Sequence, residues 1–186
     1  MSRSDEIQSA AIELFYEQGY NATSLKEIAD RINLRAPSLY NHIESKQKLL
    51  QDIMFDGIDV LNSEFDEAVA QSEDIFEKIR LAAQALVRHN IRRKKQAYVN
   101  STEIPSLEAG ARDELVRRRR SYADRWVKLI ESGVSAGVIV SSEPLLTTFN
   151  IIDLCAGLSR WYRPDGRWSE ERLVAHYGRL TVSMLV

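Results

Sequence analysis

The chain is poor in cysteine and in net charge, and each scarcity excludes a class of protein. Its single cysteine, Cys155, cannot form an intramolecular disulfide in 186 residues, and a lone thiol suits a reducing compartment. The formal net charge is −2, from 25 lysines and arginines against 27 aspartates and glutamates. This balance excludes a wholly basic protein that coats nucleic acid, but it does not exclude a local cationic surface.

The sequence also lacks long hydrophobic runs. The strongest apolar run, "VSAGVIV", is far shorter than the ~20 residues that a membrane-spanning helix needs. The first residues, "MSRSDEIQSAAIELF", become acidic and amphipathic at once, unlike the basic start and apolar stretch of a secretory signal. We therefore expect a soluble, cytoplasmic protein with no membrane partner.

Signals for catalysis or metal binding are equally scarce. His42, His89 and His176 lie far apart and lack the spacing of a metal-ligand motif. Cys155 stands in an apolar helical stretch rather than in a nucleophile signature, and no glycine-rich phosphate loop follows a strand. We expect no metal and no cofactor. An enzyme and a helical protein-interaction module both stay open as hypotheses. A gel shift with the gene's own upstream DNA would separate either of them from a protein that binds DNA.

Helical periodicity is the dominant positive signal. Ile7, Ala11 and Leu14 begin an apolar stripe with a period of 3.6 residues, and Ser4 is the expected cap of that helix. Gly19 supplies a left-handed residue that ends it, and "SLKE" at residues 24–27 is a capping box that opens a second helix. No alternating strand pattern with hairpin turns is found. The sequence predicts an all-α fold of about nine helices.

Helix lengths divide the chain into two expected domains. Residues 1–48 read as three short helices, and residues 49–186 as longer ones. A long helix from about Lys46, behind a cap at Ser45, joins the two parts. We predict an N-terminal helix-turn-helix DNA-binding domain, followed by a helical domain for ligand binding and dimerisation.

The segment "SLKEIADRINLRAPSLYNHI", residues 24–43, carries the DNA-binding prediction. Two short helices flank a turn at Asn33, and asparagine tolerates the left-handed backbone that such a turn uses. Residues 36–43 are the expected recognition helix, with Pro37 in its first turn, where a missing N–H costs nothing. Its polar side chains suit phosphate oxygens and base edges: Ser38, Tyr40, Asn41 and His42. The alternative is that they are solvated residues on a small helical bundle.

The stretch "AIELFYEQGYNATSLKEIADRINLRAPSLYNHIESKQKLL" resembles the N-terminal domain of TetR-type transcriptional regulators. The shared motifs run in register: a first helix that ends in "QGY", then "TSLKEIA", then "LYNHIESK" followed by "LL". The resemblance implies a homodimeric repressor that leaves a palindromic operator when a small ligand enters its C-terminal domain.

The resemblance also implies which residues meet DNA. Those at the start of the second helix that would touch phosphate are Thr23 and Ser24. Those that would face the groove are Arg35, Ala36, Pro37, Ser38 and Asn41, and those that would anchor backbone phosphates are Tyr40, His42 and Lys46. Asn33 stands where the family usually has glycine, and Arg35 stands where a capping serine is common. We expect the operator sequence to depend on the second departure.

The C-terminal two-thirds combine arginines and aromatic residues in "RRRRSYADRW" and "WYRPDGRWS". Together they look like a TetR branch that responds to acyl-coenzyme A thioesters in lipid or steroid catabolism. The ligand-binding candidates are Asn90, Tyr98, Arg117, Arg120, Trp126, Arg160 and Trp161. The alternatives are a solvated arginine face paired with acids, core packing of Trp126, and a structural turn at "WYRPDGRWS".

Dimerisation follows from the DNA-reading prediction. One recognition helix reads too few base pairs for useful specificity, and helix-turn-helix proteins double the readout through a two-fold axis. The last two expected helices carry apolar stripes, and by resemblance they would form a four-helix bundle with their twins. The candidates for that interface are Leu173, Tyr177, Leu180 and Met184.

Overall fold

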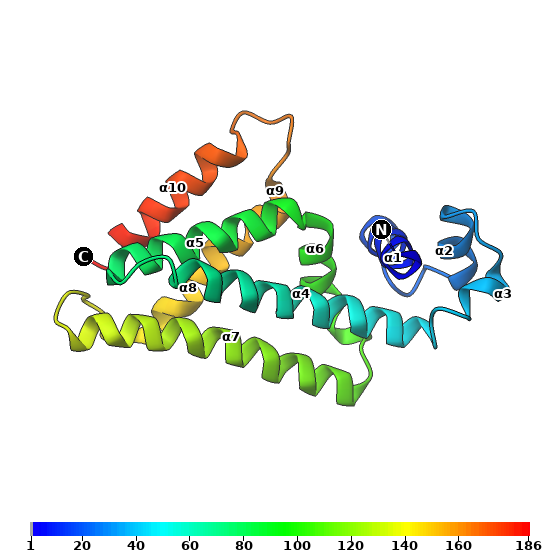
Figure 1. The fold of residues 1–186 in the computed structure, drawn as a ribbon, viewed down its shortest axis with the longest axis horizontal. Coiled ribbons are helices and arrows are strands. Elements are labelled where there is room, and N and C mark those ends of the chain that lie inside the picture. The colour runs from blue at the N-terminus through cyan, green and yellow to red at the C-terminus, as the bar shows by residue number, and fades with distance from the viewer. Residues whose placement is uncertain (1) are drawn as a thin grey trace. The chain divides into compact units, whose positions relative to one another are not determined.

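The computed structural model describes residues 2–186 and confirms the all-α prediction (Figure 1). Across these residues the backbone forms ten α-helices, one 3-10 helix and no strand. The prediction was about nine helices, and the four-residue α9 is too short to show a helical period in the sequence. The elements are α1 (Arg3–Gln18), α2 (Leu25–Arg31), α3 (Ala36–Leu39), α4 (Lys46–Val69), α5 (Ile75–Arg92), α6 (Lys94–Thr102), the 3-10 helix η1 (Ile104–Ser106), α7 (Ala109–Ser135), α8 (Pro144–Ala156), α9 (Leu158–Trp161) and α10 (Glu170–Ser183).

The chain folds as two compact units, and neither is continuous in sequence. The first holds the chain up to Gly57 together with Lys95–Val116. The second holds Ile58–Lys94 and Arg117–Val186. Helices α4 and α7 therefore contribute residues to both units. The functional division at residue 48 stays a prediction.

Local capping fixes the helices of the first unit. Gly19 ends α1 with φ +85°, as predicted. The expected cap at Ser4 is wrong, because the cap lies two residues earlier, at Ser2: the Ser2 hydroxyl accepts the N–H of Asp5 at 3.1 Å. The Asp5 carboxylate in turn accepts the Ser2 N–H at 2.7 Å, and this capping box satisfies two backbone donors at once.

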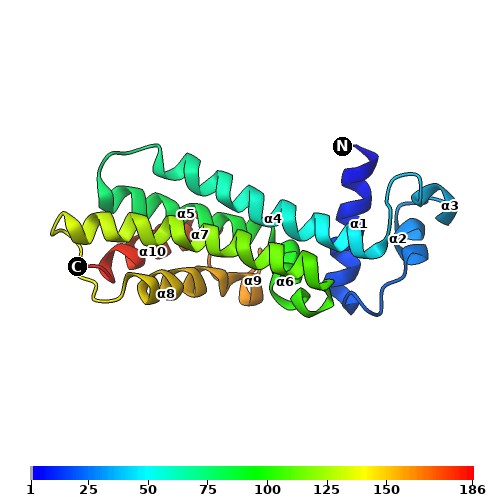
Figure 2. The ribbon, with the colours of Figure 1, turned by 90° about the horizontal axis from the view of Figure 1, so that it is seen from below.

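An apolar core holds the first unit together. In Figure 2, α1 lies across the start of α4, while α2 and α3 follow one another beyond it. Ile7, Phe15, Ile28, Leu39 and Leu50 are each at most 1% exposed. Burying side chains of this size stabilises a fold by about 1.5–3 kcal/mol apiece. The two helices of the helix-turn-helix are therefore held by packing rather than by their own helix propensity.

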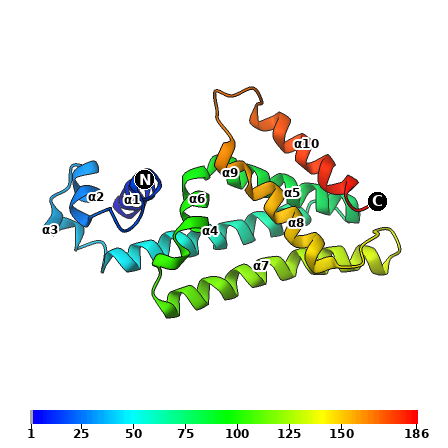
Figure 3. The same ribbon diagram turned by 180° about the vertical axis from the view of Figure 1, so that it is seen from behind.

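Helix α5 is the centre of the second unit. Helices α8, α9 and α10 all pack against it, and Figure 3 shows α10 lying along it. A Cβ placed at Gly178 of α10 would lie 2.9 Å from Cγ of Gln84 on α5, so glycine permits the close approach. Within residues 2–186, no helix is long and apolar enough to cross a membrane.

Candidate functional site

The helix-turn-helix forms as the sequence predicts, with one correction. The Ser24 hydroxyl accepts the Glu27 N–H at 3.2 Å, and the Glu27 carboxylate accepts the Ser24 N–H at 2.7 Å, which confirms the capping box. Hydrogen bonds from Ser24 hold the pKa of Glu27 below its usual range. Asn33 makes the turn with φ +53°, the left-handed backbone expected of it.

The correction concerns the recognition helix. It was expected to run through residues 36–43, but α3 ends at Leu39, and residues 40–42 form turns. The Asn41 N–H bonds to the Ser38 carbonyl, and the His42 N–H to the Leu39 carbonyl, a tighter pattern than an α-helix uses. Arg35 provides no side-chain cap, and such a short uncapped helix gains too few hydrogen bonds to extend.

This reading segment, residues 35–42, faces solvent. Arg35, Pro37, Asn41 and His42 are exposed, and Tyr40 is 59% exposed, although large aromatic side chains are usually covered. Ala36 and Ser38 are half-buried. Throughout residues 2–186, no hydrogen bond or ion pair is found for the side chains of Arg35, Tyr40 and Asn41. Donors and acceptors held out in this way are available to a phosphate or a base edge.

Thr23 and Lys46 have a different environment from the reading segment. The Thr23 side chain is buried, and its hydroxyl donates to the Gly19 carbonyl at 2.8 Å. The Lys46 ammonium donates to the carbonyl oxygens of Tyr20 at 2.9 Å and Thr23 at 2.7 Å. Both polar groups therefore stabilise the turn between α1 and α2, which shapes the unit around the exposed residues.

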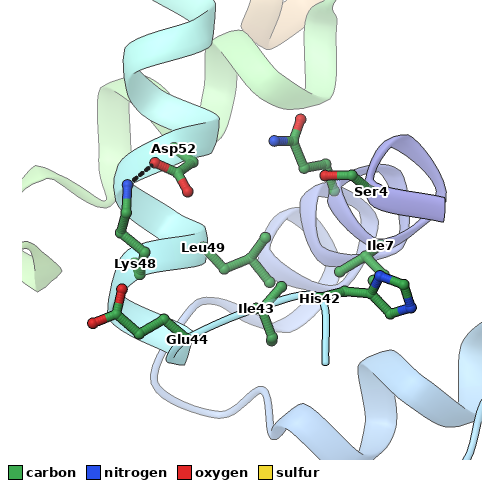
Figure 4. A pocket seen from close by; sticks show the side chains of 9 residues that line it. Ser4, Ile7, His42, Ile43, Glu44, Lys48, Leu49 and Asp52 are labelled. Carbon is green, nitrogen blue, oxygen red and sulfur yellow. Dashed lines mark hydrogen bonds and ion pairs between the residues drawn. The ribbon is translucent and has the colours of Figure 1, made fainter. Parts of the chain in front are cut away.

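A pocket of about 220 Å³ lies beside the reading segment, between the start of α1 and the start of α4 (Figure 4). Ile7, Ile43 and Leu49 form its apolar part. Its rim carries His42 and the Lys48–Asp52 ion pair. His42 is thus placed at an edge where an apolar floor meets charged groups.

Ion pairs offset much of the acidic charge of the first unit. The Arg31 guanidinium lies 2.9 Å from the Glu17 carboxylate and 3.5 Å from that of Glu13. This arginine lowers the pKa of Glu17, and Lys95 lies 2.8 Å from Glu13. Glu13 and Glu17 therefore have cationic partners of their own, whereas no acidic partner of Arg35 in the reading segment is found within residues 2–186.

In the second unit, two of the ligand candidates belong to the core. Trp126 is fully buried, with its ring centroid 5.2 Å from that of Phe65 in an edge-to-face contact. Asn90 is buried, and its amide donates to the Leu86 carbonyl at 2.9 Å. The indole N–H of Trp126 has no hydrogen-bond partner among the described residues. A ligand that placed an acceptor beside this N–H would gain a hydrogen bond.

The arginine run is a helix face that partly pairs with acids. Arg118 lies 2.5 Å from Asp59, and Arg125 pairs with Asp66. The two pairs are seven residues apart on both α4 and α7, one heptad on each helix. The candidates Arg117 and Arg120 are exposed on the same helix. Tyr98, in contrast, lies in the first unit, with its ring centroid 5.0 Å from that of Tyr16.

A groove of about 490 Å³ runs along the start of α10. Trp161 and Trp168 line it, with ring centroids 6.2 Å apart, and both are more than a third exposed. Its remaining lining residues are Arg172, Leu173, His176, Tyr177 and Arg179. Sequence reasoning included Trp161 and the neighbouring exposed Arg160 but missed Trp168, Arg172, His176 and Arg179. The stretch "WYRPDGRWSEER" already brings Trp168 and Arg172 together, whereas His176 and Arg179 reach the groove only through the turns of α10.

The turn that leads into this groove follows the predicted chemistry. The Gly166 N–H donates to the Arg163 carbonyl at 3.0 Å, which closes the Pro-Asp-Gly turn. The Ser169 hydroxyl accepts the Arg172 N–H at 3.3 Å and caps α10. The last turn of the loop therefore fixes where Trp168 stands relative to the first turn of α10.

The four interface candidates, three on α10 and Met184 directly after it, differ in exposure. Leu173 is 5% exposed within its own protomer, Tyr177 and Leu180 are half-buried, and Met184 is 41% exposed. Three apolar side chains on α8 that were not among the candidates are exposed: Leu145, Leu146 and Phe149. In a lone protomer, such a row of apolar residues on α8 has no partner to pack against.

No group of three or more metal-ligating side chains occurs within residues 2–186. Cys155 is fully buried, and burial raises the pKa of its thiol to about 12. His89 is buried with Nδ1 2.8 Å from the Glu64 carboxylate.

A three-helix head with a solvent-facing reading segment, joined to a larger helical region, defines the class of helix-turn-helix transcriptional regulators. Two family models agree. Residues 7–53 match the model for bacterial regulatory proteins of the tetR family, and residues 72–185 match that for the tetracyclin repressor-like C-terminal domain. The chain belongs to the TetR family of transcriptional regulators.

Similar proteins span the same length. The HTH-type transcriptional repressor KstR2 of Mycolicibacterium smegmatis is 25% identical over 181 residues, which cover 95% of this chain and 87% of the repressor. The crystal structure of a tetR-family regulatory protein from Rhodococcus RHA1 has a TM-score of 0.91 at 25% identity, covering 100% and 98% of the two chains. AibR, solved with isovaleryl coenzyme A and operator DNA, has a TM-score of 0.85 at 25% identity, covering 99% and 98%.

Proposed function

We propose that the chain is a ligand-responsive transcriptional repressor that binds a palindromic operator as a homodimer. A small-molecule effector, an acyl-coenzyme A thioester, releases it. The observation that carries the proposal is the exposed, unpaired reading segment at residues 35–42, in a family whose relative AibR is solved with both an acyl-coenzyme A and operator DNA. KstR2, a repressor, supports the direction of control.

The reading segment supports direct contact with a duplex. In the proposed complex, Arg35 and Asn41 meet base edges in the major groove, since guanidinium and amide groups make bidentate contacts there. Tyr40 and His42 meet the phosphates that flank the groove, together with Ser24 at the start of α2. Two copies of the segment stand about 34–36 Å apart, or a multiple of that, to enter grooves on one face of the operator. The place of action is then the cytoplasm, where the operator is.

Exposed apolar residues support the homodimer. Leu145, Leu146 and Phe149 on α8, with Met184 at the C-terminal end of α10, are each more than 40% exposed. A two-fold interface buries the same patch of both protomers, so a second copy would cover all four. Leu180 would join this seam, and Leu173 would support it from within its own protomer. Tyr177, which also lines the groove along α10, would stand where the seam borders that groove.

The groove along α10 supports a nucleotide-bearing effector. Trp161 and Trp168 offer faces on which a purine can stack, and the arginine heads of Arg172 and Arg179 can fork onto phosphate oxygens. Arg160 lies close by on α9. Coenzyme A carries an adenine, a diphosphate and a further phosphate, which are the groups that such a groove would hold. Arg117, Arg120, Asn90, Tyr98 and Trp126 stay candidates for the acyl part.

Release would follow from differential affinity. An effector can shift the equilibrium between two conformations of a regulator only by as much as its binding free energies for the two conformations differ. In the proposed mechanism, the effector-bound dimer holds its two reading segments at a spacing that no longer fits the operator.

Fluorescence anisotropy tests this function. A labelled duplex from the gene's own upstream region is titrated with the chain, and then with isovaleryl, long-chain and steroid-derived coenzyme A thioesters. We expect a salt-sensitive complex with two protomers per site, released by at least one thioester. Free coenzyme A and the free acid serve as controls. If the complex forms but no thioester dissociates it, the proposed effector class is contradicted. If no complex forms at any salt concentration, the proposed regulator function is contradicted.

A further inference from the structure

The DNA-binding unit includes a segment from far along the chain, Lys95–Val116. These residues lie outside the N-terminal family match at 7–53 and inside the C-terminal match at 72–185. On α6, the Gln96 amide donates to the Ile53 carbonyl at 2.9 Å, and the Asn100 amide to the Met54 carbonyl at 3.4 Å. The same helix meets α1 through the Tyr98–Tyr16 ring contact. The segment is therefore packed against both α1 and α4.

Glu103, just after α6, reaches the turn between α1 and α2. Its Oε1 accepts the backbone N–H of Tyr20 at 3.2 Å, across 83 residues of sequence. Its Oε2 accepts the hydroxyl of Ser106 at 2.7 Å. Both carboxylate oxygens are engaged, so the side chain is fixed between η1 and the turn.

Tyr20 needs this acceptor because it is 5% exposed and follows the end of α1. Among the described residues, Glu103 is the acceptor found for its N–H, and a buried N–H left without one costs free energy comparable to a lost hydrogen bond. The other side of the same residue is held by Lys46, which donates to the Tyr20 carbonyl. Glu103 therefore binds the backbone N–H of Tyr20, and Lys46 binds its backbone carbonyl.

That residue stands directly before the proposed phosphate contacts. Thr23 donates its N–H to the Tyr20 carbonyl at 3.2 Å, and Ser24 is the cap of α2. A shift of the Tyr20 peptide therefore moves Thr23, its hydrogen-bond partner, and with it the N-cap Ser24 that follows directly. Since operator contacts need hydrogen-bond geometry, a small displacement there weakens them.

We propose that Glu103 is a positioning residue for operator binding, supplied to the DNA-binding head by the C-terminal family region. It touches no DNA. It holds the turn at Tyr20 and through it sets the place of the α2 N-terminus. This inference rests on the proposed DNA-binding function.

Four variants test it: Glu103→Ala, Glu103→Gln, Ser106→Ala and, as the matched control, Glu108→Gln. Glu108 is exposed and five residues along in the same segment, so its change removes the same charge. Operator affinity is measured by anisotropy, effector affinity by calorimetry, and exchange of the Tyr20 amide by NMR. We expect Glu103→Ala to weaken operator binding about tenfold or more, as loss of a hydrogen bond to a charged acceptor predicts. Its Tyr20 amide should exchange at least tenfold faster.

The remaining variants separate positioning from charge. Glu103→Gln keeps an acceptor oxygen and should stay within about threefold of the parent, and Ser106→Ala should fall between the two. Glu108→Gln should change nothing, and the effector affinity should be the same in all four. Equal strengthening of operator binding by Glu103→Ala and Glu108→Gln would overturn the proposal in favour of plain repulsion from DNA. An unchanged Tyr20 amide exchange in Glu103→Ala would also overturn it.

Failure of this inference can be told from failure of the proposed function. If the parent chain binds no operator, the function fails, while the exchange rate of the Tyr20 amide still reports whether Glu103 holds the turn. If Glu103→Ala does not fold, the Glu103→Gln and Ser106→Ala variants give the same two readouts.

Discussion

The ammonium of Lys46 lies 2.9 Å from the carbonyl oxygen of Tyr20 and 4.2 Å from the centre of the Tyr20 ring. It also donates to the Thr23 carbonyl at 2.7 Å. An ammonium has three donors, and two of them are used by the protein itself. The family resemblance predicts that Lys46 anchors a phosphate. Its contacts instead join α4 to the turn between α1 and α2, and we call this connection the strut.

Lys46→Met should therefore weaken operator binding without changing how that binding depends on salt. Each lysine that neutralises a phosphate adds about one to the slope of log affinity against log salt. Methionine keeps the length of the side chain but removes the donors, which leaves two carbonyl oxygens without a charged partner, at about 1.5–3 kcal/mol for such bonds. We expect a lower unfolding free energy and a parallel salt plot, measured by urea titration and anisotropy.

Lys26 provides the comparison for Lys46. It is exposed on α2 in the same unit, so Lys26→Met removes the same charge without removing the strut. Its unfolding free energy should stay within about 0.5 kcal/mol of the parent. A salt slope that falls by one in Lys46→Met, with stability intact, would return Lys46 to the role of phosphate anchor.

Tyr40→Ala should abolish tight operator binding and leave the fold unaffected. The ring is 59% exposed and packs against little of its own protomer, so truncating it should change the unfolding free energy by no more than about 0.5 kcal/mol. Operator affinity should fall at least about tenfold, because the side chain is proposed to meet phosphate from the reading segment. Tyr16→Phe, a tyrosine variant elsewhere in the same unit, is the control. Full-affinity binding by Tyr40→Ala would remove this residue from the interface.

The features that local sequence could predict are those made within a few residues. Ser24 caps α2 through Glu27, Gly19 ends α1, and Asn33 makes the turn, because each depends on backbone geometry that one residue type satisfies. The recognition helix was predicted at the right place but too long. Whether an uncapped helix continues past Leu39 depends on the free energy of a few hydrogen bonds against that of ordering the chain, and hydrophobic periodicity does not report this difference.

The features that local sequence could not predict join distant parts of the chain. Nothing near Glu103 indicates that it bonds to Tyr20, and the hydrogen bond depends on where α6 docks. In the same way, the arginines and tryptophans of the groove were visible as a cluster, but which of them face one another follows from the turn before α10. Trp126 was predicted as either core packing or a ligand contact; it is fully buried beside Phe65, and its ligand role stays a prediction.

Gly57→Ala should destabilise the first unit although alanine is the better helix former. A Cβ at Gly57 would overlap the Asn100 amide, which donates to the Met54 carbonyl. The amide must move, and overpacking of this kind costs about 1–3 kcal/mol. Gly110→Ala is a matched control, since nothing lies within 4 Å of its Cβ position, and it should gain about 0.5–1 kcal/mol. Urea unfolding compares the two, and equal values would contradict the close approach.

The Cys155 thiol should be unreactive in the folded protein and should make stability depend on alkaline pH. Burial raises the pKa of this thiol to about 12 from an ordinary value near 9. The thiolate is the nucleophile, so at pH 8 iodoacetamide should label the unfolded chain and spare the folded one. Above pH 9 the unfolded thiol ionises while the folded one does not, so stability should fall by about 1 kcal/mol by pH 10. Cys155→Ala should remove that part of the slope, and an unaltered slope would show that other groups cause it.

Charged substitutions on α8 and α10 should separate dimerisation from folding. Phe149 and Met184 are exposed in the protomer, so Phe149→Asp and Met184→Asp should leave its fold intact and turn a dimer into monomers in analytical ultracentrifugation. Leu173 is 5% exposed, so Leu173→Asp should instead lower the unfolding free energy by several kcal/mol, as burying an unpaired charge does. Because a single head reads too few base pairs, the two monomeric variants should also lose operator binding while still taking up effector. Dimers that persist with aspartate at both Phe149 and Met184 would move the two-fold seam to another face of the second unit.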